Sequence, residues 1–199
     1  MGKSIIGRKI ILVLLASCLF FIFLTGCGKE QPDNNALSFN KDGSITQYIS
    51  EEFDIQNYDF DDWKLTAETE ISEYNSANGD KVSIKDIKLE DNILHCTMTY
   101  ADDDAYFDIN NEPLFYGTIA QAITAGYSLL VPVTNIKTAE GISSAELQEL
   151  KDYKIAIFSG ERTVFTYRDI EYVSNNAGVG DDLKKAVITG DSTAYVVFK

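Results

Sequence analysis

The sequence has few of the residues on which several protein classes depend. Among its 199 residues are only three cysteines, three prolines and one histidine. The scarcity of proline, together with 45% hydrophobic and 12% aromatic residues, excludes disordered, collagen-like and low-complexity chains. A serine hydrolase is not indicated either, because the chain lacks a Gly-x-Ser-x-Gly segment and offers a single imidazole. What remains is a globular protein that relies on its hydrophobic core.

Positive charge is also scarce. Seventeen Lys and Arg residues stand against 31 Asp and Glu residues, a formal net charge of −14. Lys3, Arg8 and Lys9 are the only charged residues among the first 27, so the rest of the chain carries about −17. A surface this negative repels polyanions, which excludes nucleic acid as a partner. It attracts cations, cationic peptides and basic protein surfaces.

The longest apolar run lies near the amino terminus. Residues 10–24 form an apolar stretch of 15 residues behind the basic segment 1–9. As a helix this run would reach about 22 Å, short of the roughly 30 Å of a bilayer core. A basic segment followed by a short apolar one is typical of a secretory signal. The pattern predicts export from the cytoplasm and a signal that is removed.

The end of this signal resembles the lipobox of bacterial lipoproteins, which consists of Leu, small residues and Cys. Leu24, Thr25, Gly26 and Cys27 match the pattern at each position. The resemblance implies that a diacylglyceryl group joins the Cys27 thiol and that the signal is cut before this residue. The mature protein would then be anchored by lipid in the cell membrane, on its extracytoplasmic face.

The sequence therefore predicts three parts. Residues 1–26 are the signal peptide, residues 27–38 are the lipidated Cys and a flexible tether, and residues 39–199 are one domain. Within that domain Cys96 is the sole cysteine. An internal disulfide is excluded, although the predicted compartment would permit one.

Periodicity predicts an α+β fold for the domain. Residues 59–78 have a helical apolar stripe ended by Gly79, and residues 82–89 and 93–100 predict a hairpin. Residues 102–126 predict two helical pieces, and a strand-rich, mainly antiparallel part begins at Tyr153. We therefore expect amphipathic helices in the first part of a single domain and an antiparallel sheet in the second.

No cofactor or metal site is predicted. His95 and Cys96 are neighbours on a predicted strand, where successive side chains point to opposite faces, so they cannot form a catalytic pair. Asp102, Asp103 and Asp104 lack the spacing of a calcium-binding loop. Zinc would need more His and Cys ligands than the chain provides.

The segment 100–127 has the most unusual composition. Its candidate binding surface consists of six residues: Tyr106, Phe107, Tyr116, Asp102, Asp103 and Asp104. Rings bordered by carboxylates would attract a cationic or amphipathic ligand. The competing interpretation places the rings in the core and uses the aspartates to cap and solvate the start of a helix.

A further resemblance covers most of residues 39–199. The segments FNKDGSITQYISEEFD and LFYGTIAQAITAGY, with the lipobox, are similar to small acidic surface lipoproteins of Gram-positive bacteria. This resemblance implies a location at the cell surface and assigns no catalytic residues.

From these patterns we expect a noncatalytic, lipid-anchored cell-surface lipoprotein that binds a protein, a peptide or a small ligand. Two alternatives remain open. One is a structural accessory subunit of an envelope complex, and the other is a hydrolase that uses carboxylates alone. In each case the membrane partner is reached through the lipid on Cys27.

Overall fold

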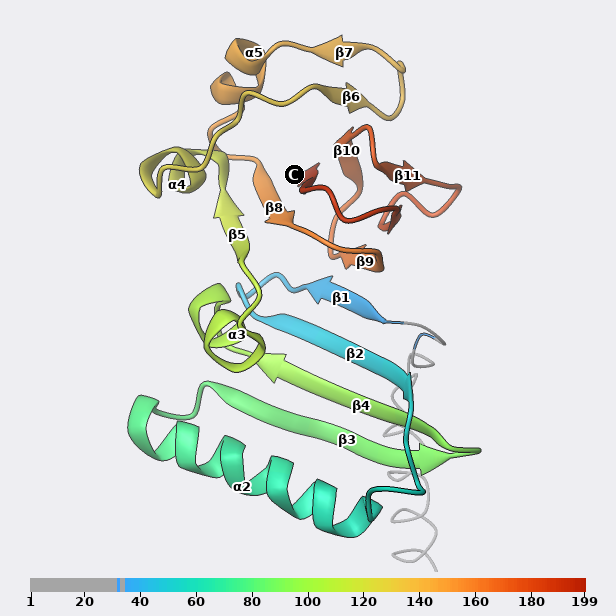
Figure 1. The fold of residues 1–199 in the computed structure, drawn as a ribbon. Coiled ribbons are helices and arrows are strands. Elements are labelled where there is room, and N and C mark those ends of the chain that lie inside the picture. Colours follow the sequence, from blue (N-terminus) through green and yellow to red (C-terminus); the bar gives the residue numbers. More distant parts are fainter. Residues whose placement is uncertain (1–31, 33–34) are drawn as a thin grey trace, which may run out of the picture. The chain divides into compact units, whose positions relative to one another are not determined.

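Two sheets dominate the computed structural model, which describes residue 32 and residues 35–199 (Figure 1). The strands are β1 Ala36–Phe39, β2 Ile45–Glu52, β3 Val82–Glu90, β4 Ile93–Tyr100, β5 Leu114–Thr118, β6 Val133–Asn135, β7 Gly141–Ile142, β8 Lys154–Phe158, β9 Arg162–Thr166, β10 Ile170–Ser174, β11 Ala177–Val179, β12 Lys185–Ile188 and β13 Ala194–Phe198. The helices are α2 Phe60–Asn78, α3 Asp103–Asn110, α4 Ile119–Thr124 and α5 Ser144–Glu149. The seven-stranded sheet has the order β11-β12-β9-β1-β2-β4-β3, and the six-stranded sheet has the order β5-β8-β13-β10-β6-β7.

Helix α2 forms where its local signals predict it. The Asp59 side chain caps the helix by accepting from the backbone N–H groups of Asp61 and Asp62. Those two carboxylates also lie at the positive end of the helix dipole. Gly79 ends the helix with a φ of 83°, a conformation that L side chains rarely adopt. Only Ile71 of the helix is buried, so α2 lies lightly against the sheet.

The predicted hairpin is confirmed as β3 and β4. Asp91 and Asn92 connect the strands with φ values of 51° and 64°, the left-handed pair that a two-residue turn requires. Glu90 and Ile93 face each other on either side of this turn. The strand β3 is an edge of the seven-stranded sheet, and α2 runs beside it (Figure 1).

The domain begins earlier than the sequence indicated. Residues 36–38, predicted as tether, belong to β1, which pairs antiparallel with β2 and parallel with β9. Leu37 is buried in the core. The side chain of Asn35 holds the neighbouring strand, because its amide oxygen accepts from Ser50 N–H at 2.9 Å. Four residues are too few to show a period, so the segment was indistinguishable from a linker.

The segment 102–126 contains a strand where only helix was predicted. Between α3 and α4 lies β5, which pairs with β8. Its residues from Leu114 to Gly117 are all buried, and a run of buried residues this short cannot be assigned by periodicity. Thr118 then caps α4 with a reciprocal capping box that includes Gln121.

The α+β class is confirmed, whereas the expected separation of helices and sheet is not found. β1 to β4, from the first part of the domain, supply more than half of the seven-stranded sheet. The pairing is mostly antiparallel, with β1 and β9 as a parallel pair.

Alternate side chains of the six-stranded sheet serve two different cores. Phe158 and Phe198 face the seven-stranded sheet, where Phe39 lies 5.9 Å from Phe158 between ring centroids. Their neighbours Ile157 and Val197 pack on the opposite side with residues of α4 and α5. The six-stranded sheet is therefore covered on both faces.

Candidate functional site

The surface predicted from Tyr106 and Tyr116 does not exist. Tyr106 is 0% exposed and Tyr116 is 9% exposed, so neither ring is available to a ligand. Tyr116 lies 4.9 Å from Phe39 between ring centroids, and its hydroxyl donates to the Asn40 carbonyl oxygen at 2.6 Å. These rings are buried because their segment connects the two sheets. Phe107 is 45% exposed on the outer side of α3, without the other two rings beside it.

Asp102 caps α3. Its carboxylate accepts from Ala105 N–H at 2.8 Å and from Lys81 Nζ at 2.9 Å. Burial acts to raise the pKa of Asp102, but these two hydrogen bonds outweigh burial and lower it. Asp104 follows in the first turn and is exposed. The capping interpretation of the three aspartates therefore describes the start of α3 better than the binding interpretation.

Asp103 lies beside a cavity of about 450 Å³. Its Oδ2 accepts from the backbone N–H of Tyr116 at 3.1 Å, and burial raises the pKa of its carboxyl group. A raised pKa would suit a general acid, but Asp103 is the sole acidic residue that lines this cavity. The paired carboxylates of glycoside hydrolysis are therefore not assembled around it.

A second set of charged groups lies between α3 and β9. Arg162 pairs with Glu112, and the Tyr106 hydroxyl donates to Glu112 Oε2 at 2.6 Å. Burial acts to lower the pKa of Arg162, but the carboxylate and the phenol outweigh burial and raise it. Among the described residues, Arg162 Nε is buried without a hydrogen-bond partner. The group joins the end of α3 to the seven-stranded sheet, a structural role.

His95 and Cys96 lie on β4 as predicted. Cys96 faces the core and His95 is only partly buried. Burial raises the pKa of the Cys96 thiol to about 11, which keeps it protonated near neutral pH. Neither residue contributes to a nucleophilic site.

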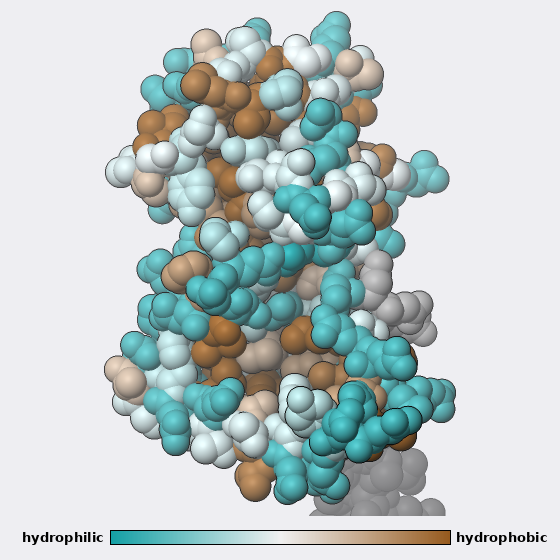
Figure 2. All heavy atoms as spheres, in the orientation of Figure 1, coloured by the Kyte–Doolittle hydropathy of each residue, from teal (hydrophilic) through white to brown (hydrophobic). Residues whose placement is uncertain are grey.

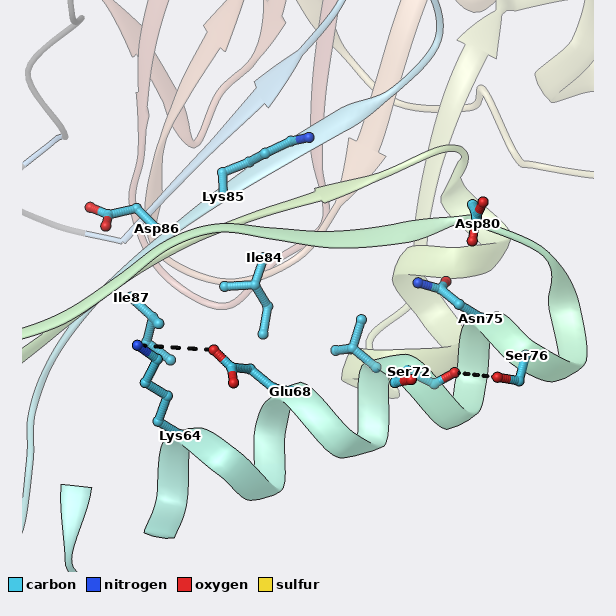
Figure 3. A pocket seen from close by; sticks show the side chains of 11 residues that line it. Lys64, Glu68, Ser72, Asn75, Ser76, Asp80, Ile84, Lys85, Asp86 and Ile87 are labelled. Atoms are coloured by element: carbon cyan, nitrogen blue, oxygen red, sulfur yellow. Dashed lines mark hydrogen bonds and ion pairs between the residues drawn. The ribbon is translucent and has the colours of Figure 1, made fainter. Parts of the chain in front are cut away.

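The site that we regard as the best candidate is a groove between α2 and β3, with a volume of about 640 Å³ (Figure 3). Ile71 from the helix and Ile84 and Ile87 from the strand form its floor. Lys64 and Glu68 lie at the rim, where their charged groups are 4.0 Å apart. Figure 2 shows hydrophobic side chains in the hollow above α2, bordered by hydrophilic ones. The groove is larger than the cavity beside Asp103 and offers a mixed apolar and polar lining.

A β-bulge creates the floor of this groove. Ile84 and Ile87 are three residues apart, so in a regular strand they would point to opposite faces. The register shifts between Ile84 and Asp86, which places Ile84 opposite Met98 and Ile87 opposite Cys96. Since Met98 and Cys96 share one face of β4, both isoleucines lie on the α2 side.

The side chain of Asn75 closes one end of the groove. Its Oδ1 accepts from Val82 N–H at 3.0 Å, and its Nδ2 donates to the Val82 carbonyl oxygen at 2.7 Å. The same Oδ1 accepts from Lys81 N–H at 3.1 Å. The amide thus satisfies the edge of β3 as a neighbouring strand would.

Acidic and aromatic side chains lie beyond the other end, outside the groove lining. Residues 51–63, which we call the 51–63 cluster, include six acidic residues and no Lys or Arg. The ring of Phe53 is buried at its centre, 5.8 Å from Trp63 and 6.5 Å from Tyr58 between centroids. Tyr58 is 62% exposed. Because Phe53 N–H donates to the Asn92 carbonyl oxygen at 2.8 Å, the cluster borders the β3–β4 turn.

Sequence reasoning missed both the groove and the 51–63 cluster. The segment FDIQNYDFDDW shows the cluster in its composition, which is richer in rings and carboxylates than the segment 100–127. The spacing of Ile84 and Ile87 within VSIKDIKLE breaks the alternation of a strand and indicates a bulge. Neither pattern predicts that a groove lies between α2 and β3.

Comparisons with protein-family models, with curated proteins and with solved structures gave no match for this chain. In the part of the chain that the structure describes, no group of three or more His, Cys, Asp or Glu side chains is arranged to hold a metal ion. Within those same residues, no helix has the length and apolarity to cross a membrane. Cys27, the predicted lipid attachment site, lies outside the described residues, as does the predicted signal peptide.

Proposed function

We propose that this protein is a noncatalytic binding module, held at the extracytoplasmic face of the cell membrane by lipid on Cys27. The groove between α2 and β3 is its ligand site. The observation that carries this proposal is the groove floor of Ile84 and Ile87, which a bulge turns toward α2 and which stay only half-buried beside that helix. Grooves of several hundred cubic ångströms with a few polar groups at the rim are the usual form of ligand sites.

The light packing of α2 supports this assignment. A helix of 19 residues that buries only Ile71 gives up much of the apolar burial that normally stabilises a helix in a protein. The apolar surface left open beneath it is available to a ligand. A protein or peptide segment suits the groove better than a small polar molecule, because the site is open along the strand (Figure 3).

Selection from a displayed peptide library tests the groove, using the full-length protein and two variants. Ser72 is exposed and lines the groove, so Ser72→Trp would fill it without disturbing the core. Thr66 is exposed on the same helix and does not line the groove, so Thr66→Trp is the matched control. We expect selected peptides to bind the parent and Thr66→Trp but not Ser72→Trp. Equal binding to all three proteins would contradict the assignment of the groove.

The lipid anchor is tested separately. Cys27→Ser removes the thiol to which the lipobox directs the lipid, so we expect an unprocessed, larger form that keeps residues 1–26 and carries no diacylglyceryl group. Intact mass of the parent should show the diacylglyceryl group and the loss of residues 1–26. Maturation of Cys27→Ser to a diacylated species of unchanged mass would overturn the anchor.

A further inference from the structure

The outer edge of β3, beside α2, has no neighbouring strand among the described residues. β3 pairs with β4 on one side and ends the seven-stranded sheet on the other. At Val82 this outer edge is satisfied by the Asn75 amide, which shows that the Val82 N–H and carbonyl oxygen point away from β4. Beyond the bulge the strand continues from Ile87 to Glu90. Among the described residues, no strand pairs with the outer side of that stretch.

The bulge and the charges of β3 limit what can pair with this edge. Lys85 lies at the bulge and Lys88 follows it, and both features hinder indiscriminate pairing between flat strand edges. A short segment could still pair with Ile87–Glu90. Its alternate side chains would then reach the floor of the groove, since Ile84 and Ile87 face α2.

The direction of β3 determines which part of such a segment meets the 51–63 cluster. β3 runs from the Asn75 end of the groove toward the β3–β4 turn, which the cluster borders through the Phe53–Asn92 hydrogen bond. A strand added antiparallel to β3 would start at the cluster. There the exposed ring of Tyr58 and the carboxylates of Asp61 and Asp62 favour positive charge.

We infer that the groove takes an extended peptide that adds to β3 as an antiparallel strand. The peptide places apolar side chains against Ile84 and Ile87 and carries Lys or Arg at its amino-terminal end, beside the 51–63 cluster. This inference rests on the proposed function and specifies its ligand. Main-chain hydrogen bonds give the affinity, while the isoleucine floor and the cluster give the specificity.

A designed peptide tests the inference. The probe is acetyl-Lys-Lys-Thr-Val-Thr-Val-Thr-Val-Thr-amide, and its control has two Glu residues in place of Lys. Titration by fluorescence anisotropy should show affinity at least about tenfold higher for the lysine peptide at low salt, with a smaller difference at high salt. Equal affinities would overturn the cationic preference.

N-methylation separates strand addition from other modes of binding. Backbone N–H groups of alternate residues point to opposite edges of a strand, so the valine and threonine sets face opposite sides. Methylation of one set should lower affinity at least about tenfold, and methylation of the other should change it less than about twofold. If both methylated peptides bind as the parent does, strand addition is wrong.

Protein variants locate the end of the peptide. Tyr58→Ala should weaken the lysine peptide several-fold, and Tyr127→Ala, at a partly exposed tyrosine beyond α4, should not change its affinity. Equal effects of the two variants would contradict contact with the 51–63 cluster. If library peptides require an open groove but the lysine peptide fails to bind, this inference fails while the proposed function stands. If Ser72→Trp changes neither, the proposed function itself fails.

Discussion

Two regions of this protein are both rich in aromatic rings and aspartates, but they differ in how far their rings are buried. The segment 100–116 and the 51–63 cluster both mix aromatic rings with aspartates. In the first, Tyr106 and Tyr116 are buried and the aspartates cap a helix or bond to backbone. In the second, Tyr58 is exposed and only Phe53 is buried. Composition therefore identified a kind of surface without saying which segment would form it.

The difference lies in the neighbours of each segment. Residues 100–116 run from one sheet to the other, so Tyr116 meets Phe39 on one side and Phe198 on the other. The 51–63 cluster connects β2, an interior strand, to α2, a helix that is itself lightly packed. Its rings pack on one another around Phe53.

Truncation of one ring in each region should give the largest difference in stability. Tyr106→Ala should lower the free energy of unfolding by about 3–5 kcal/mol, because it leaves a cavity and removes the partner of Glu112. Tyr58→Ala should cost less than about 1 kcal/mol, because the ring is exposed. Urea unfolding followed by circular dichroism measures both. Similar losses at the two sites would contradict the burial described above.

The ion pair of the first region gives the next largest effect. Glu112→Gln leaves the guanidinium of Arg162 without its carboxylate in a largely buried place, so we expect a loss of about 2–4 kcal/mol. Arg162→Met combined with Glu112→Leu should cost less than the sum of the single changes, since neither charge is then left unpaired. Strictly additive losses would show that the two residues do not interact.

The hydrogen bonds that link α2 to β3 should give a smaller stability effect than the ion pair. Asn75→Ala removes the hydrogen bonds to Val82 and Lys81 and should cost about 1–2 kcal/mol. Asn78→Ala is the matched control, because the Asn78 side chain bonds only within its own helix and is exposed. Its expected loss is below about 0.5 kcal/mol. Equal losses at both sites would mean that Asn75 does not hold the helix against the strand.

The smallest expected effect concerns pH. Burial raises the pKa of Asp103 in the folded state, so folding favours its protonated form. The stability that this group contributes is present at pH below its unfolded pKa and is lost as pH rises through the folded pKa. The free energy of unfolding of Asp103→Asn minus that of the parent should therefore be larger at pH 7 than at pH 3. The expected change is less than about 1 kcal/mol. Urea unfolding midpoints at both pH values give the comparison, and a change of opposite sign would contradict it.

The elements that could be predicted from the sequence are those whose signals are local. Helix α2 follows from the cap at Asp59 and the stop at Gly79, and the hairpin follows from the turn at Asp91 and Asn92. Each of these signals acts through hydrogen bonds or dihedral angles within a few residues. They could be recognised before any tertiary contact was known.

Which rings are buried, and where a groove opens, depends on contacts between segments that are far apart in the chain. Tyr116 is core because Phe39, far away in the chain, packs against it, and residues 36–38 are a strand because β9 pairs with them. The groove depends on a bulge that turns Ile87 toward α2 and on the light packing of that helix, which leaves Ile87 half-buried. Burial is a property of both partners in a contact, and a sequence pattern reports only one of them.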